Sequence, residues 1–322
     1  MKTIFVVNPK AGSGKRFDLI MGKIEKLAQT RENVGYYITK KAHDAKKFVC
    51  EYCHTNGAAR FIACGGDGTL SEILNGAIGY RNVEIGVVPI GSGNDFCRNF
   101  DSKESFFDLE KQISGACVDC DAIKYNTLIS GEEKSGYCAN MFNIGFDCAV
   151  ADTTNVLKSK TFFSGSMAYL VSIFINLVKK KTSDLEIEID GINRGRGELL
   201  LTSIANGCYC GGGLKTNPIA LINDGLININ IVKNVLRLKF LTLLPKYING
   251  TCLGVRNIEK IISSIKCSRI KISPTDGKIR MSVDGEICDA GEVEFKIEHN
   301  AFKFVVPYLS NVSSENNIIQ MV

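Results

Sequence analysis

The sequence contains no tryptophan and no long uninterrupted apolar run. A membrane-spanning helix needs about 20 consecutive apolar residues. The nearest candidate, "MAYLVSIFINLVKK" from Met167, ends in lysines too early to span a bilayer. The apolar start before Asn8-Pro9 is also too short for the apolar region of a signal peptide, so we expect no export. No linker rich in Pro, Gly or Ser divides the chain, and we find neither an internal repeat nor a low-complexity tract.

The sequence also lacks a large excess of either charge, because 39 Lys and Arg nearly balance 34 Asp and Glu and leave a net charge of +5. That value predicts no nucleic-acid partner, although it suits a protein that binds phosphates or visits anionic lipid. The 13 cysteines include the spacings "CEYCH" and "CVDC". In a chain that is not exported, we interpret them as free thiols in a reducing compartment rather than as haem or zinc ligands.

The order of apolar runs predicts two domains. Over the first part of the chain, strands and helices alternate, which is typical of a parallel sheet between two helical layers. The strands are expected at 3–8, 34–39, 60–65 and 83–91, and the helices at about 15–29, 43–55 and 70–78. Later segments alternate with period two, as in "LEIEI" and "VEFKI", and predict an antiparallel sandwich. We therefore expect an α/β nucleotide-binding domain at 1–122, a β-rich domain at 123–306 and a tail at 307–322 that packs back on the first domain.

Three glycine-rich loops follow strands of the expected parallel sheet. They are "NPKAGSGK" from Asn8, "GGDGT" from Gly65 and "PIGSGND" from Pro89. Ligands bind beyond the carboxyl ends of such strands, so the loops are expected to share one rim. Glycines let backbone N–H groups approach an anion, and the following helix N-terminus adds positive potential. The first loop lacks the spacing of a Walker A motif. An ordinary turn before a helix remains an alternative for each loop.

The second and third loops also carry acids. A carboxylate repels phosphate unless a cation bridges them. The position of Asp67 in a loop suited to phosphate therefore indicates that this residue binds Mg²⁺. We expect its flanking glycines to leave ordinary φ/ψ space and to leave room for a ligand, and Thr69 to cap the next helix. In the third loop Asp95 is either a second acid near the metal or an N-cap, and Arg98 either neutralises phosphate or pairs with Asp95.

These loops, followed by "NGCYCGGGLKTNPIALINDGLININIV" and "MSVDGE", resemble in order and spacing the bacterial diacylglycerol kinase-like lipid kinases. The resemblance covers nearly the whole chain. It implies ATP as co-substrate on the first domain and a β-rich second domain that supplies lipid contacts and catalytic groups. The residues that it implies for ATP binding are Asn8, Pro9, Lys10, Ala11, Gly12, Thr39, Gly65, Gly66, Asp67, Gly68, Thr69 and Ser92.

The resemblance also implies a structural Mg²⁺ held by Asp224 with the backbone carbonyls of Leu221 and Leu226. It places the general base at Asp284 or Glu286, without deciding between them. Asp67 and Asp95 complete the implied catalytic acids. Lys15 and Arg98 are candidate phosphate contacts, and so is Lys158 or Lys160. Without the resemblance, a hairpin turn remains an alternative for "VDGE".

The function that these implications favour is ATP- and Mg²⁺-dependent transfer of the γ-phosphoryl group to a lipid hydroxyl, that of diacylglycerol or a related alcohol. The protein is then expected in the cytoplasm, transiently associated with the inner face of the membrane, with no nucleic acid bound. A homodimer is compatible with the resemblance. Two alternatives stay open: a kinase on the same scaffold with a soluble acceptor such as NAD, and a non-catalytic regulator that binds nucleotide or lipid. The helix around Met167 either packs in the core or faces lipid.

Overall fold

The computed structural model describes residues 1–11, 14–100, 102, 104–129, 132–160, 168, 171–176 and 182–308, without the side chains of 14–16 and 158–160. The chain forms two compact units. Unit 1 comprises Met1–Cys120 and the segment that begins at Asn300, and unit 2 comprises Asp121–His299. Several sequence predictions lie outside the described part: Gly12, the side chains of Lys15, Lys158 and Lys160, and the tail beyond residue 308.

Unit 1 is a parallel sheet in the order β15-β4-β3-β1-β2. Its elements are β1 (Lys2–Val7), α1 (Gly14–Thr30), β2 (Val34–Ile38), α2 (Asp44–Asn56), β3 (Ala59–Gly65), α3 (Asp67–Ala77), β4 (Val83–Pro89) and α4 (Leu109–Ser114). The end of β15 (Val293–Val306) joins the sheet through the parallel pairing of Phe304 with Ile85. The predicted α/β class is confirmed, and the sheet edge beside β4 is supplied by the far end of the described chain.

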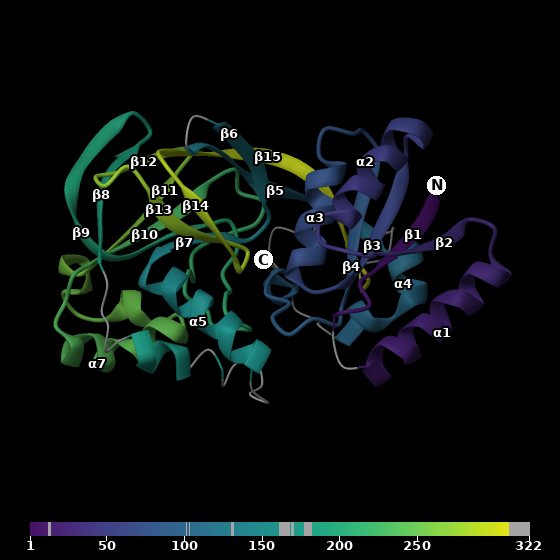
Figure 1. Ribbon diagram of the computed structural model, residues 1–322, viewed down its shortest axis with the longest axis horizontal. Coiled ribbons are helices and arrows are strands. Elements are labelled where there is room, and N and C mark those ends of the chain that lie inside the picture. Colours follow the sequence, from purple (N-terminus) through teal and green to yellow (C-terminus); the bar gives the residue numbers. More distant parts are fainter. Residues whose placement is uncertain are drawn as a thin grey trace. The chain divides into compact units, whose positions relative to one another are not determined.

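Consecutive residues of a strand point to opposite sides of the sheet. The strands of this sheet are apolar on both sides, so helices cover both faces. On one face, the Phe61 ring lies edge-on to the ring of Tyr52 from α2, with centroids 5.6 Å apart. On the other, Ile62 belongs to the same buried cluster as Ile24 of α1 and Leu109 of α4. Figure 1 shows the strands of this unit between these helices. The core therefore fixes the strands whose carboxyl ends carry the glycine-rich loops.

Unit 2 is β-rich, as predicted, with antiparallel pairing along the order β14-β13-β7-β9-β8-β12-β15 and with β10 between β9 and β11. Its elements are β5 (Ala116–Ile129), β6 (Glu132–Cys138), β7 (Met141–Gly145), α5 (Phe146–Lys160), β8 (Ser183–Ile189), β9 (Ile192–Ala205), β10 (Ile227–Lys233), α7 (Arg237–Ile248), β11 (Ile262–Cys267), β12 (Arg269–Pro274), β13 (Ile279–Val283) and β14 (Glu286–Ala290). β5 and β15 each run from one unit into the other.

A helical layer packs on one face of the unit 2 strands (Figure 1). The Phe146 ring of α5 meets the Phe240 ring of α7, with centroids 4.9 Å apart. Ile173, from the helical residues 171–176, is buried in the same cluster. Phe174 beside it is 58% exposed, so core packing, one of the two alternatives for this helix, holds for Ile173 and not for Phe174. Tyr169, Leu170 and Leu177 lie outside the described residues.

The 13 cysteines are free thiols. Burial raises the pKa of the Cys53 thiol to about 11 and places that of Cys64 higher still. A thiol with such a pKa carries almost no thiolate at neutral pH and is neither a nucleophile nor a metal ligand there. The "CEYCH" spacing therefore belongs to a helix with one buried cysteine, Cys53, and one exposed cysteine, Cys50.

Asp147, in the first turn of α5, makes the stability of the fold depend on pH. Its side chain is buried, and its carboxylate accepts a hydrogen bond from the Tyr247 hydroxyl at 3.2 Å. Burial raises its pKa to about 6, although the Tyr247 hydrogen bond opposes the shift. Because the folded state binds the proton more tightly than the unfolded state, the stability from this group falls as pH rises from about 4 through 6.

We expect the unfolding free energy of wild type to fall relative to that of Asp147→Asn by about 2 kcal/mol between pH 4 and pH 7, since the pKa shift is roughly two units and pH 4 lies close to the unfolded pKa. Denaturant titrations at the two pH values measure that difference. An unchanged difference would show that the carboxyl titrates alike in the folded and unfolded states.

Candidate functional site

The three glycine-rich loops of unit 1 meet at the carboxyl ends of β1, β3 and β4. The Asn8 N–H donates to the Cys64 carbonyl at 3.0 Å, and the Asn8 side-chain amide donates to Thr69 Oγ1 at 3.2 Å. The Gly91 N–H donates to the Gly65 carbonyl at 3.1 Å. These contacts hold the three loops together as one rim, which we call the glycine rim: residues 8–11, 65–69 and 89–95.

The glycines of the rim serve close packing rather than unusual backbone angles. Gly65, Gly66 and Gly68, which flank Asp67, have no positive φ, and neither have Gly91 and Gly93. The expectation that the glycines around Asp67 leave ordinary φ/ψ space is therefore wrong. A Cβ on Gly66 would lie 3.3 Å from the Gly91 Cα, and one on Gly91 would collide with Gly66. The missing side chains let two loops touch backbone to backbone. Asn94, at φ +54, makes the left-handed turn.

Helix α3 begins earlier than the sequence suggests. Its N-cap is Gly66 in an extended conformation, and Asp67 occupies the first helical turn. Thr69 is therefore not the cap, and the prediction that it would be is wrong. Its hydroxyl instead accepts the Asn8 amide and fills the space left by the missing side chain of Gly65. The positive end of the α3 dipole thus opens onto the rim at Gly66, as an anion site requires.

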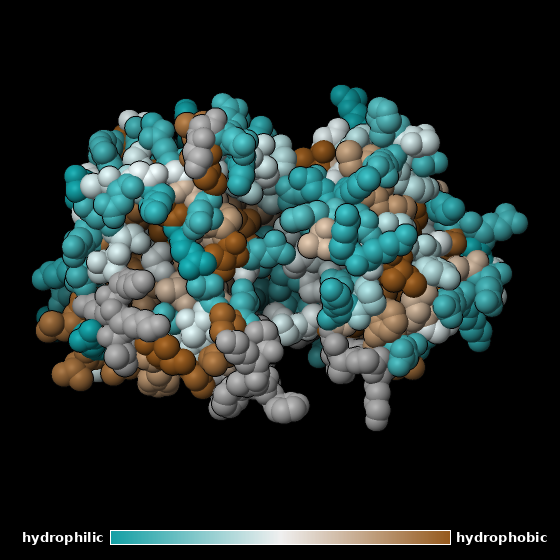
Figure 2. Space-filling view, in the orientation of Figure 1, coloured by the Kyte–Doolittle hydropathy of each residue, from teal (hydrophilic) through white to brown (hydrophobic). Residues whose placement is uncertain are grey.

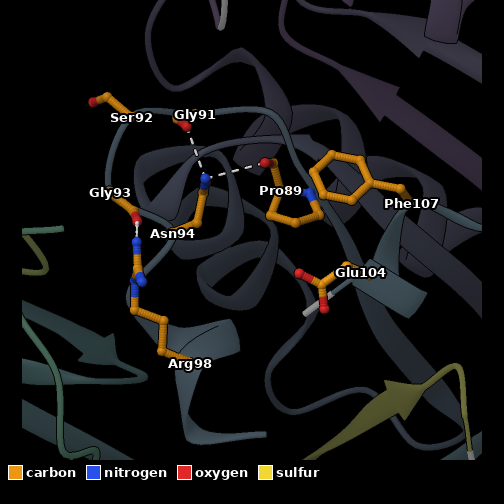
Figure 3. A pocket seen from close by; sticks show the side chains of 8 residues that line it. All are labelled: Pro89, Gly91, Ser92, Gly93, Asn94, Arg98, Glu104 and Phe107. Carbon is orange, nitrogen blue, oxygen red and sulfur yellow. Dashed lines mark hydrogen bonds between the residues drawn. The ribbon is translucent and has the colours of Figure 1, made fainter. Parts of the chain in front are cut away.

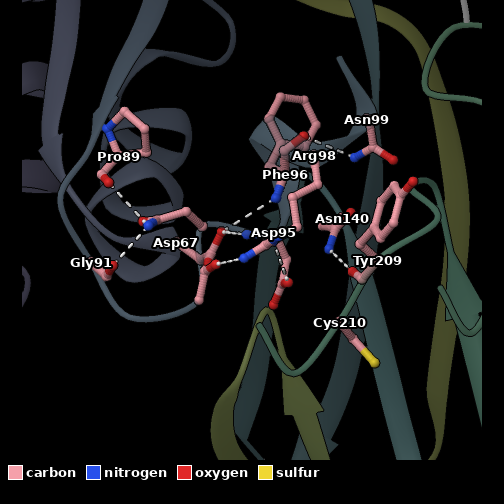
Figure 4. A network of polar contacts seen from close by, with 12 residues as sticks. Asp67, Pro89, Gly91, Asp95, Phe96, Arg98, Asn99, Asn140, Tyr209 and Cys210 are labelled. Carbon is pink, nitrogen blue, oxygen red and sulfur yellow. Dashed lines mark hydrogen bonds and ion pairs between the residues drawn. The ribbon is translucent and has the colours of Figure 1, made fainter. Parts of the chain in front are cut away.

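The Asp67 carboxylate is fixed by backbone donors of the third loop (Figure 4). Its Oδ1 accepts the N–H of Asp95 at 2.8 Å and that of Phe96 at 3.4 Å. Desolvation raises the pKa of Asp67, against the lowering effect of the backbone N–H groups. Nearby positive charge, such as a metal ion, would stabilise the ionised form that this burial disfavours.

A second acid lies beside Asp67. A Cβ at Gly93 would lie 2.7 Å from Asp67 Oδ2 and 3.4 Å from Asp95 Oδ2, so both carboxylates border the same glycine. Arg98 Nε lies 3.6 Å from Asp95 Oδ1, which realises the predicted ion pair. Mg²⁺ at phosphate sites is typically held by one or two carboxylates, with water and phosphate oxygens completing the shell. Asp67 and Asp95 fit that donor set.

A pocket of about 280 Å³ opens beside the third loop (Figure 3). Arg98 and Ser92, both predicted as ligand contacts, line it, and Phe107 and Glu104 form part of its wall. The Arg98 guanidinium also donates to the Gly93 carbonyl at 3.3 Å. The pocket therefore combines a cation, a hydroxyl and an aromatic ring next to the glycine rim.

The remaining ATP contacts implied by the resemblance lie around the first loop. The Lys10 N–H donates to Asn8 Oδ1 at 3.0 Å, which closes a turn that includes Pro9, and the Ala11 N–H donates to the Asn8 carbonyl at 3.1 Å. Thr39 is buried, and its hydroxyl donates to the Val7 carbonyl at 3.3 Å. Both segments follow neighbouring strands of the sheet, β1 and β2.

Glu72 is a residue of this region that sequence reasoning missed. Its carboxylate, on α3, accepts the N–H of His43 at 2.8 Å and that of Ala45 at 3.0 Å. It thereby caps the start of α2 from a neighbouring helix. The sequence shows an acid shortly after the "GGDGT" loop, but it does not show that this acid binds the N–H groups of His43 and Ala45, which lie more than 25 residues earlier.

In unit 2 the structure separates the two acids of "VDGE". Asp284 (φ +47) and Gly285 (φ +93) form the two-residue turn between β13 and β14, so the hairpin interpretation is correct. The Asp284 carboxylate accepts the N–H groups of Ala139, Asn140 and Met141 at 3.2, 3.2 and 2.9 Å. Glu286 begins β14 and is exposed. Asp284 therefore organises the neighbouring turn, whereas Glu286 faces solvent.

The loop at 221–226 does not fit Mg²⁺ as it is arranged. Asp224 Oδ2 lies 2.5 Å from Lys266 Nζ, and Asp224 Oδ1 accepts the Leu226 N–H at 3.1 Å. The ammonium of Lys266 thus already neutralises the only acid of the implied metal site. We therefore derive no step from a metal at Leu221, Asp224 and Leu226.

The same loop is held by a second acid that the sequence did not single out. Asp121 Oδ2 accepts the Gly225 N–H at 2.7 Å, while Asp121 Oδ1 lies 2.7 Å from His299 Nδ1. Asp121 is fully buried. The conformation of 221–226 is therefore fixed by protein groups on both sides.

We expect Lys266→Met to lower the free energy of unfolding by about 1–2 kcal/mol, because it leaves the partly buried Asp224 carboxylate without its counter-charge. A metal chelator should leave the wild-type melting temperature unchanged. Thermal unfolding with and without chelator measures both effects, and Lys260→Met, at an exposed lysine, is the control. A melting temperature lowered by chelator and restored by Mg²⁺ would instead show that this loop holds a divalent ion.

The fold and the glycine rim together define a class of protein. Its members join a parallel α/β unit, whose glycine-rich loops are suited to bind phosphate, to an antiparallel β-rich unit. The chain matches the family model of the diacylglycerol kinase catalytic domain over residues 2–125. It matches that of the YegS C-terminal NAD kinase beta sandwich-like domain over residues 140–306. The chain therefore belongs to the diacylglycerol kinase-like lipid kinase family.

One curated relative and two solved structures are also similar to this chain. A diacylglycerol kinase of Mycobacterium tuberculosis is 26% identical over 293 residues, which span 89% of this chain and 91% of the relative. A solved diacylglycerol kinase from Bacillus anthracis shares the fold, with a TM-score of 0.67 at 22% identity over 94% of this chain and 96% of that one. Yeast NADH kinase, solved with NADH, has a TM-score of 0.53 at 12% identity over 95% of this chain and 83% of that one.

Proposed function

We propose that the protein is a lipid kinase that transfers the γ-phosphoryl group of ATP to the hydroxyl of diacylglycerol or a related lipid alcohol. The observation that carries the proposal is the position of Asp67. This carboxylate is fixed by the N–H groups of Asp95 and Phe96 at the glycine rim and borders Gly93 together with Asp95. Such a group is suited to hold Mg²⁺ against nucleotide phosphates.

The residues of the rim have separate roles in this proposal. Backbone N–H groups at the start of α3 and in the first loop receive the phosphates, and Ser92 and Arg98 add a hydroxyl and a positive charge. Asp67 and Asp95 would hold Mg²⁺, which when bound neutralises phosphate charge. Phosphoryl transfer depends mainly on such alignment and neutralisation.

The chemical step forms one bond and breaks another. The lipid hydroxyl oxygen attacks the γ-phosphorus, and the bond from that phosphorus to the bridging oxygen of ADP breaks. The hydroxyl proton passes to a carboxylate, for which we propose Glu286. Asp284 is less suited as the base because three backbone N–H groups already occupy its carboxylate. Its role in the proposal is to hold the hairpin that presents Glu286.

The lipid acceptor is supported by the family and by the name of the Mycobacterium relative. The alternative acceptor, NAD, is favoured by two observations: the second family model is described as NAD kinase-like, and yeast NADH kinase shares the fold. We rank it second because the kinase-domain model that matches the α/β part is that of diacylglycerol kinases.

Radiolabelled ATP with Mg²⁺, incubated with the protein and a panel of acceptors, tests the proposal. The panel contains diacylglycerol, phosphatidylglycerol, sphingosine, undecaprenol and NAD, with lipids presented in detergent micelles. We expect label in a lipid. Label in NAD alone would overturn the lipid assignment, and bound nucleotide without any transfer would favour the regulator.

The site of action follows from the acceptor. No helix in the described part of the chain is long and apolar enough to cross a membrane. A kinase of membrane lipids must then reach its substrate from the aqueous side, so we propose peripheral and transient association with the membrane surface, from the cytoplasm.

A further inference from the structure

The start of α7 exposes the two most solvent-accessible leucines among the described residues. Leu236 is 80% exposed and Leu238 is 78% exposed. Burial of a leucine side chain stabilises a protein, so two neighbouring leucines in water forgo a substantial gain. In Figure 2 hydrophobic side chains gather at the lower left edge, where Figure 1 places α7.

These leucines are not core residues that packing failed to cover. The buried face of α7 consists of Phe240, Leu243, Leu244 and Tyr247, which follow helical spacing. Leu238 lies on the opposite side of the helix by that spacing, and Leu236 precedes the first turn as the N-cap residue. Leu238 therefore points away from the core because of its position on the helix, and Leu236 is in solvent because it precedes the first helical turn.

Basic residues surround the leucines. Arg237 and Lys239 alternate with them, and both are exposed. Lys233, Lys246 and Arg256 are further cations on the same stretch, and no Asp or Glu occurs between Asp224 and Glu259. We name Leu236 and Leu238, with Lys233, Arg237 and Lys239, the α7 patch.

The beginning of this helix departs from the usual rules in a consistent direction. Leucine is a poor N-cap, and Leu236 makes no capping hydrogen bond with its side chain. The first turn has no acid but carries two cations, where the helix dipole favours negative charge. Local departures of this kind are expected where function requires them. An external surface that is both apolar and negatively charged complements the leucines, the positive charges and the positive end of the helix dipole together.

We propose that the α7 patch docks the protein on an anionic lipid bilayer. Leu236 and Leu238 would enter the boundary between headgroups and acyl chains, and the cations would contact lipid phosphates. The positive charges favour an anionic bilayer over a purely apolar partner, because a purely apolar partner would make no favourable contact with the cations. The inference deepens the proposed function, on which it rests for its biological purpose, since a lipid kinase must work at such a surface. Binding itself requires neither ATP nor catalysis.

Sedimentation with vesicles tests the proposal without nucleotide. Vesicles of phosphatidylcholine, with and without phosphatidylglycerol, are mixed with the full chain, and the bound fraction gives the partition coefficient. We expect binding to vesicles that contain phosphatidylglycerol and its loss at high salt. The double variant Leu236→Ser, Leu238→Ser should bind at least about tenfold more weakly. Serine is a favoured N-cap, so this variant is expected to fold.

The double variant Arg237→Gln, Lys239→Gln should bind about 30-fold more weakly, with the loss confined to anionic vesicles. Matched controls are Leu128→Ser, at an exposed leucine of β5, and the pair Arg194→Gln, Lys278→Gln, which removes the same charge elsewhere on unit 2. Both controls should bind like wild type. Equal loss in patch and control variants would overturn the proposal, as would equal wild-type binding to neutral and anionic vesicles.

Two further readouts separate this inference from its rivals. Size-exclusion chromatography of the leucine variant reveals a second copy of the chain as occupant: a dimer that becomes a monomer would overturn the membrane assignment. Kinase activity on micellar lipid, where no bilayer is needed, should survive in both patch variants. Vesicle binding by a protein that phosphorylates no lipid would leave the docking proposal standing while the proposed function fails.

Discussion

Asp67→Asn is expected to lower kcat/KM for lipid phosphorylation by about 100- to 1000-fold, because it removes one of the two charges that would hold Mg²⁺ at the glycine rim. The asparagine Oδ1 can still accept the N–H groups of Asp95 and Phe96, so the third loop keeps its conformation. Burial already disfavours the charged carboxylate, as its raised pKa shows, and the variant should therefore melt no lower than wild type.

Steady-state kinetics over a range of Mg²⁺ concentrations measures this effect. The concentration that gives half-maximal activity should rise in the variant, a change that a purely structural role would not produce. Asp18→Asn, at an exposed acid of α1, is the control for loss of one negative charge on the same unit. If Asp67→Asn retains wild-type activity and Mg²⁺ dependence, Asp67 has no place in the mechanism.

Glu286→Gln is expected to lower kcat by about 100-fold or more, since a glutamine cannot accept the hydroxyl proton. The side chain is exposed at the start of β14, so the melting temperature should not change. Asp284→Asn should behave differently. Its carboxylate holds the N–H groups of residues 139–141, and a neutral amide would lose charge-assisted hydrogen bonds worth about 2–3 kcal/mol together.

Thermal unfolding and kinetics on the same preparations distinguish the two acids, with Glu259→Gln as the control at an exposed glutamate. The expected pattern is a loss of turnover without a loss of stability for Glu286→Gln, and a loss of stability for Asp284→Asn. The reverse pattern, with full activity in Glu286→Gln and an inactive but stable Asp284→Asn, would assign the base to Asp284.

Local patterns in the sequence predicted the α/β order of unit 1, because strand and helix periodicities do not depend on distant contacts. They also predicted the shared rim, since loops after neighbouring parallel strands end on the same side. The conformation of "GGDGT" was predicted wrongly. Helix α3 starts at Asp67, and the absence of side chains at Gly66 and Gly91 lets their backbones come into contact. That contact joins loops more than twenty residues apart, and no local pattern reports it.

Partners that are distant in sequence decided the remaining assignments. The resemblance implied Mg²⁺ beside Asp224 in the "INDGL" segment, but not that Lys266 on β11 would pair with this acid. The dipeptide Asp284-Gly285 predicted a hairpin, but not that the Asp284 carboxylate would bind the turn at 139–141. The apolar helix around Met167 was considered for contact with lipid, whereas the exposed leucines lie at the start of α7.

By itself the sequence determined the class of each half, the order of the motifs and the family they resemble. These depend on local periodicity and residue type, which the chain carries in any conformation. The tertiary structure alone decided which acid faces a cation, which faces backbone N–H groups and which apolar side chains stay in water. Those properties depend on neighbours brought together by folding, and Asp67, Asp224 and Asp284 differ only in these neighbours.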